Sequence, residues 1–255
     1  ADDIGLQSGG WTVSWQGTGN TNADFPGGTS IYDGLQAQVE AAGGSIVSDT
    51  NANVDAAIVM FSETPYAEMQ GDIYSVTWFD QRGERDLIQA LSGRGVPVVA
   101  VFLTGRPLWV NDILNDVDAF VVSWLPGSEG VGVADMLLRD PSGSVQFDFT
   151  GRLPMPWPAL DVNVADRDLP VDEFLFPLGY GLSVEDRVVW SDVSERLIGA
   201  DNSLDQEVFN GGPRGNWRLY TGDSSDWAVE ATSSVSQSSS GSVKLKGIDR
   251  RVQED

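Results

Sequence analysis

Histidine and cysteine are both absent from this 255-residue sequence. Their absence excludes disulfides, thiol chemistry, zinc sites built from these ligands and a Ser-His-Asp triad. Acid/base chemistry near neutral pH then falls to carboxylates, with Tyr or Lys as further options. No apolar run approaches the roughly 18 residues of a membrane span. Nothing in the sequence indicates a cofactor or a bound metal ion.

Positive charge is scarce, because 38 acidic residues face only 15 basic ones and the net charge is −23. A field of that sign repels nucleic acids and anionic lipids, so neither is expected as a partner. The plainest interpretation of the charge is a soluble protein from a salty medium. The sequence also has nine tryptophans, which suit either a core or a surface that stacks on sugars.

Strands alternate with helices in the first part of the chain. Short apolar runs predict buried strands over residues 54–61, 97–103 and 119–124. Helical periodicity, caps and stop signals predict helices over residues 30–42, 82–91 and 128–138, and a short one near residue 113. This alternation predicts an α/β fold, with a mainly parallel sheet sandwiched by helices over residues 1–182. Ligand sites in such sheets lie beyond the carboxyl ends of the strands.

The pattern changes after Leu182. Residues 183–255 have little helical periodicity, a Ser-rich stretch at 233–242 and short alternating pieces. We therefore expect the start of a second, β-rich domain of the β-sandwich kind, cut short at Asp255.

Carboxyl groups follow the first predicted strand. Glu63, Glu68 and Asp72 lie in a segment that Pro65 and Gly71 mark as a loop. A carboxyl held there beside aromatic rings and away from water would have a raised pKa, as a general acid needs. A solvated acidic loop in an acidic protein is the alternative.

Trp11 and Trp15 flank a polar, Gly-rich segment near the start of the chain. A tryptophan face can stack on a sugar ring, but two core aromatics one helical turn apart would have the same spacing. Arg106 and Arg152 lie in turn-rich segments; we interpret them as structural arginines that bridge loops rather than as a carboxylate clamp.

Six segments together resemble the family 3 glycoside hydrolases, in order and in spacing. They are GGWTVSWQG at 9–17, ETPYAEMQGD at 63–72, GRP at 105–107, WLPGSEG at 124–130, FTGRLP at 149–154 and FPLGYGL at 176–182. The resemblance is greatest to the exo-β-glucanase and β-glucosidase branch. It identifies residues 1–182 as the C-terminal α/β sandwich domain of that family.

The resemblance implies a role for individual residues. Glu68 matches the acid/base glutamate, Trp15 a tryptophan that grips the sugar next to the cleaved bond, and Trp11 its neighbour in the substrate-binding site. Glu63 also fits the pattern, and we interpret it as a structural residue that ties the loop down. The nucleophile lies on an N-terminal (β/α)8 barrel that this sequence does not contain.

The function implied is that of a retaining β-glycosidase, releasing glucose from the ends of β-glucans without a cofactor. The barrel is the expected partner, and the chain alone is expected to be inactive. We expect a periplasmic or extracellular protein, with any signal peptide removed or upstream of Ala1. A non-catalytic carbohydrate-binding or interface domain is the alternative. A flavodoxin-like or receiver-like domain is disfavoured, because neither a phosphate-cradling loop nor a Lys near the last strand is found.

Overall fold

A computed structural model describes residues 2–73, 75–80, 82–161, 174–186, 188 and 192–195, together with two short strands further on. The chain divides into two compact units, Ala1–Glu195 and Arg196–Asp255. Most of the predicted β-rich segment lies outside the described residues. Within it the structure describes β6 (Ser236–Gln237) and β7 (Val243–Lys244), which pair antiparallel. The predicted β-sandwich and the predicted domain boundary therefore stay predictions.

The first unit contains a three-stranded parallel sheet, as predicted. Its strands are β1 (Ala57–Ser62), β2 (Val98–Leu103) and β3 (Ala119–Trp124), in the order β1-β2-β3. Side chains alternate between the two faces of the sheet, as the pleat requires. Val59 and Phe61 join the larger core cluster, whereas Ile58 and Met60 pack against the smaller one.

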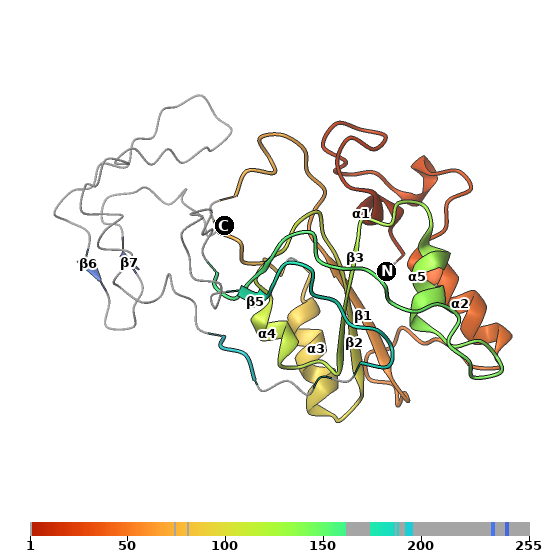
Figure 1. The fold of residues 1–255 in the computed structure, drawn as a ribbon. Helices are drawn as coiled ribbons and strands as arrows, with labels where there is room; N and C mark the ends of the chain where they lie inside the picture. Colours follow the sequence, from red (N-terminus) through yellow and green to blue (C-terminus); the bar gives the residue numbers. More distant parts are fainter. Residues whose placement is uncertain are drawn as a thin grey trace. The chain divides into compact units, whose positions relative to one another are not determined.

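Helices cover both faces of this sheet (Figure 1). On one face α2 (Ile31–Ala41) lies against α5 (Gly130–Leu137), and on the other lie α3 (Glu84–Gly93) and α4 (Asn111–Leu114). The contact of α2 with α5 depends on glycine, because a Cβ on Gly130 would lie 2.2 Å from the carbonyl carbon of Ser30. Ser30 also caps α2, since its side chain accepts a hydrogen bond from the N–H of Asp33.

Two short helices near the start of the chain were not predicted. They are α1 (Ile4–Ser8) and the 3₁₀ helix η1 (Asn22–Asp24). Gln7 of α1 is buried; it donates to the carbonyl of Gly127 and accepts from the N–H of Ile31. These bonds attach the N-terminal segment to α2 and to the loop after β3. Later in the chain, β4 (Trp157–Pro158) pairs antiparallel with β5 (Phe174–Phe176).

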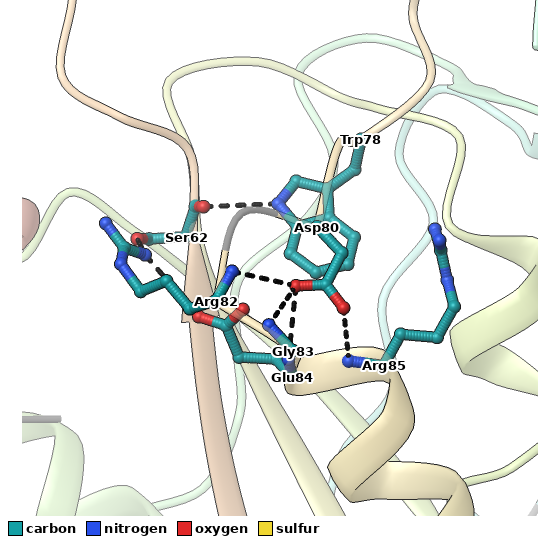
Figure 2. Close-up of polar contacts among 7 residues, drawn as sticks. All are labelled: Ser62, Trp78, Asp80, Arg82, Gly83, Glu84 and Arg85. Atoms are coloured by element: carbon teal, nitrogen blue, oxygen red, sulfur yellow. Dashed lines mark hydrogen bonds and ion pairs between the residues drawn. The ribbon is translucent and has the colours of Figure 1, made fainter. Parts of the chain in front are cut away.

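The start of α3 is organised by one carboxylate (Figure 2). Asp80 accepts hydrogen bonds from the backbone N–H groups of Arg82, Gly83, Glu84 and Arg85. Burial raises the pKa of Asp80, but a hydrogen bond with the side chain of Glu84, and then the backbone N–H groups of Arg85, Arg82 and Gly83, lower it to about 2. Arg82 lies beside the end of β1, where it donates to the hydroxyl of Ser62. Asp80 thus satisfies the free N–H groups of the first turn.

No helix in the described part of the chain is both long enough and apolar enough to cross a membrane.

Candidate active site

The candidate site lies at the carboxyl edge of the sheet, where the segments after β1, β2 and β3 meet. A hollow of about 220 Å³ opens at this edge. It is lined by residues from these three segments and from the N-terminal segment, among them Gly10, Tyr66, Thr104 and Leu125. Parallel strands end on the same side, so this convergence follows from the topology.

The loop after β1, residues 63–72, is fixed by an ion pair. Oε1 of Glu63 accepts from Nε of Arg106 at 2.8 Å, and its Oε2 accepts from the hydroxyl of Thr104 at 2.6 Å. Arg106 also donates to the carbonyl of Gly71, at the other end of the loop. A largely buried glutamate already paired in this way is poorly placed to exchange protons with a substrate. These contacts support the interpretation of Glu63 and Arg106 as structural residues.

Tyr66 lies in the middle of this anchored loop. The guanidinium carbon of Arg106 lies 4.0 Å from the centroid of its ring, a cation–π contact. Burial and then the negative charge of Glu63 raise the pKa of Tyr66 to about 12. Tyr66 therefore keeps its proton and is a neutral hydrogen-bonding group at any physiological pH.

The tryptophan segment forms an irregular, exposed turn. Trp11 and Val13 have φ angles of 59° and 62°, in the left-handed region that non-glycine residues seldom adopt. The N–H of Trp11 donates to the carbonyl of Trp15, and the two rings lie 6.1 Å apart at 42°. The two residues are 69% and 49% exposed. The alternative of two core aromatics is therefore wrong. The two tryptophans do not lie on a helix either, although their spacing of four residues matches one helical turn.

Glu68 is the residue that both tryptophans contact. Nε1 of Trp11 donates to its Oε1 at 3.1 Å, and Nε1 of Trp15 donates to its Oε2 at 2.7 Å. The structure therefore brings together all three residues that the sequence assigned to the site. Each carboxylate oxygen keeps a further lone pair for another partner.

The pKa of Glu68 differs from the sequence-based expectation. The indole N–H of Trp15 lowers it most, followed by a backbone hydrogen bond, and the indole of Trp11 adds to this effect. A raised pKa was expected for a carboxyl held away from water, but Glu68 is exposed in this chain. Hydrogen bonds to the charged form therefore outweigh desolvation.

Three further residues hold the tryptophan segment against the Glu68 loop, and sequence reasoning assigned them no role. Gln16 contacts the backbone of residues 67–68 through both ends of its amide. Thr18 donates to the carbonyl of Pro65 at 3.1 Å. A Cβ on Gly10 would lie 2.0 Å from the carbonyl oxygen of Tyr66, so only glycine allows this approach. Two features of the sequence could have pointed to these residues. They are the glycine pair Gly9-Gly10 and the run Trp15-Gln16-Gly17.

The remaining candidate, Arg152, makes a local contact, donating to the carbonyl of Gly151 at 2.8 Å. In the described part of the chain, no group of three or more His, Cys, Asp or Glu residues is placed to hold a metal ion.

The first unit is thus a parallel α/β domain that presents a carboxylate, bound by two exposed tryptophans, at the carboxyl edge of its sheet. Residues 1–184 match the glycosyl hydrolase family 3 C-terminal domain. The chain belongs to this family, which confirms the resemblance seen in its six segments.

Proteins similar to this chain include several glycosidases. A lysosomal beta glucosidase of Dictyostelium discoideum is 32% identical over 72% of this chain and 25% of its own length. A periplasmic beta-glucosidase of Salmonella typhimurium is 32% identical over 40% of this chain and 16% of its own length. Among solved structures, a point mutant of the exo-1,3/1,4-beta-glucanase ExoP of a Pseudoalteromonas species is 48% identical, with a TM-score of 0.71, over 77% of this chain and 33% of its own. This chain therefore spans a third or less of these relatives.

Proposed function

We propose that this chain supplies the acid/base carboxylate and the sugar-binding tryptophans of a retaining β-glucosidase or exo-β-glucanase. Glu68 is the acid/base, and Trp15, supported by Trp11, binds the sugar beside the cleaved bond. The observation that carries the proposal is the pair of indole donors on the two oxygens of Glu68, at the exposed edge of the domain. The nucleophile belongs to a barrel domain outside this sequence.

The two donors suit a group that must lose and regain a proton. In the first step of retention the carboxylic acid protonates the leaving oxygen while the nucleophile attacks the anomeric carbon. The indole N–H groups stabilise the carboxylate that this step produces. In the second step the same carboxylate removes a proton from water, which releases the sugar from the nucleophile.

Glu68 must carry a proton at the start of this cycle, and in the isolated chain its lowered pKa opposes that. Docking a barrel on this edge would change the balance. It would bury Glu68 and bring a second carboxylate to within about 5–5.5 Å of it, and both effects raise the pKa of a carboxyl group. The arrangement explains why we expect the chain alone to be inactive.

A second candidate function is a non-catalytic carbohydrate-binding or interface domain. The exposure of Trp11 and Trp15 favours it, because exposed indole rings bind sugars without any catalytic group. In that case, removing the carboxylate of Glu68 would leave hydrolysis unaffected.

The proposed location is the periplasm or the extracellular space. The lysosomal and periplasmic names of two relatives support a compartment outside the cytosol.

The test replaces Glu68 with Gln in the protein that joins this chain to its barrel. Hydrolysis of β-glucans should fall by about 10²–10⁴-fold, the contribution of one acid/base group. An activated aryl β-glucoside needs no acid to leave, so its first step should survive and give a burst of product. Azide needs no base; it should restore turnover and yield the β-glucosyl azide.

Glu63→Gln is the matched control, five residues earlier in the same loop. It should give neither the burst nor the azide rescue. Rescue of Glu63→Gln but not of Glu68→Gln would exchange the two assignments. Full glucanase activity in Glu68→Gln would favour the binding-domain alternative.

A further inference from the structure

Gln16 uses its whole side-chain amide on the backbone that carries Glu68. Its Oε1 accepts from the N–H of Ala67 at 2.7 Å, and its Nε2 donates to the carbonyl of Glu68 at 3.0 Å. Two successive residues of the loop are thus bound by one planar group. The amide replaces the paired hydrogen bonds that a neighbouring strand would make.

The other contacts between these two segments act at different points. The indoles of Trp11 and Trp15 bind the carboxylate of Glu68, at the flexible end of its side chain. Thr18 binds the carbonyl of Pro65, three residues before Glu68. Gln16 is therefore the contact that fixes the main chain of Glu68 itself relative to the tryptophan turn.

Such an anchor matters because the other hydrogen bond to the main chain of Glu68 is local, from the N–H of Gln70 to the carbonyl of Glu68, and does not link it to the tryptophan turn. Its side chain is exposed, as are Trp11, Trp15 and the following Met69. Water competes for hydrogen bonds at exposed groups, so the indole donors hold Glu68 only while the main chain keeps it within reach. Met69 has a φ of 71°, which shows that the chain turns sharply just after Glu68.

We propose that Gln16 is a positioning residue for Glu68, holding its carboxylate against the two indoles in the geometry that proton transfer requires. A neutral amide suits this task, because its two hydrogen bonds do not change as Glu68 gains and loses its proton. The inference rests on the proposed function in one respect, namely that Glu68 is the acid/base.

The first measurement uses the 255-residue chain and decides whether Gln16 positions the carboxylate. Gln16→Met keeps the length of the side chain and removes both hydrogen bonds. In a titration of ¹³C-labelled glutamate carboxyls by NMR, the pKa of Glu68 should rise toward the ordinary value of a glutamic acid, because the indole donors are lost. The indole N–H resonances of Trp11 and Trp15 should move at the same time.

Gln36→Met is the matched control, since Gln36 also donates to a glutamate, Glu40, at 2.8 Å, but on helix α2. It should leave the pKa of Glu68 and both indole resonances unchanged. Gln16→Glu keeps an oxygen that accepts from the N–H of Ala67 but has no N–H to donate to the carbonyl of Glu68. This variant replaces Gln16→Met in the experiment if Gln16→Met does not fold. Its indole resonances should shift as those of Gln16→Met do.

The second measurement uses the protein with its barrel. Gln16→Met should lower kcat/KM for β-glucans by about 10- to 100-fold, the cost of misplacing a reacting group by up to 1 Å. Activated aryl glucosides, which need no acid, should lose less in their first step. An unchanged pKa of Glu68 and unmoved indole resonances in Gln16→Met would overturn the inference. Failure of the proposed function would give a different result, namely that azide does not restore the activity of Glu68→Gln.

Discussion

Gly10→Ala tests how closely the tryptophan turn must approach the Glu68 loop. The new Cβ would lie 2.0 Å from the carbonyl oxygen of Tyr66 and 2.6 Å from its carbonyl carbon. Non-bonded carbon and oxygen atoms need about 3 Å or more, so the two segments must separate by about 1 Å. Both partners of the clash are backbone atoms, which cannot rotate away as a side chain could.

This separation should have two measurable effects. Overpacking of this kind costs about 1–3 kcal/mol, which lowers the melting temperature of a domain this size by roughly 2–12 °C. A displacement of about 1 Å at Glu68, the proposed acid/base, should also cost about 10²-fold in kcat/KM in the protein with its barrel. The indole resonances of Trp11 and Trp15 should move, because their hydrogen bonds to Glu68 lengthen.

Gly132→Ala is the control for this substitution, because its Cβ would meet nothing within 4 Å. It lies inside helix α5, where alanine is favoured by about 1 kcal/mol over glycine. Its melting temperature should therefore stay the same or rise. Unchanged stability together with unmoved indole resonances in Gly10→Ala would refute the close approach.

Three further predictions concern charged side chains. Asp80→Asn should lower the free energy of unfolding by about 1–2 kcal/mol at neutral pH, because the carboxylate of Asp80 binds the first turn of α3. The difference between the variant and the parent should vanish as the pH falls through about 2, the pKa of Asp80. Burial, and then a hydrogen bond with Asp80, raise the pKa of Glu84. The folded state therefore favours the protonated form of Glu84, and stability is lost as the pH rises through that pKa. In denaturant titrations from about pH 4 to pH 8, Glu84→Gln should gain stability relative to the parent as the pH rises. Trp15→Phe should raise the pKa of Glu68, as followed by carboxyl NMR, whereas an unchanged pKa would contradict the hydrogen bond.

The sheet and its main helices could be predicted from the sequence because their signals are local. Residues 98–103 form an uninterrupted apolar run, which suits a strand buried on both faces, and the structure places β2 there. The helix beginning after Ser30 carries its own cap in the sequence. The short α1 was missed, because five residues are too few to show a helical period.

Part of the candidate site could be found from the sequence. Glu68, Trp11 and Trp15 were singled out from their motifs, and tertiary structure brings them into contact across more than fifty residues of chain. The tertiary structure also answers two questions that the motifs left open. The tryptophans are exposed, and the pKa of Glu68 is lowered rather than raised. A pKa depends on which donors reach the carboxylate and how much water remains, and neither is encoded by neighbouring residues.

The sequence by itself determined the class of the fold and the family, and it singled out the carboxylate that we propose for acid/base work, because strand and helix patterns and ordered motifs are properties of neighbouring residues. Only the tertiary structure decided that Glu63 pairs with Arg106 while Glu68 stays open to a partner. It also revealed Gln16 as the link between two distant segments. The physical reason is that hydrogen bonds and desolvation act over a few ångströms in space, whatever the separation along the chain.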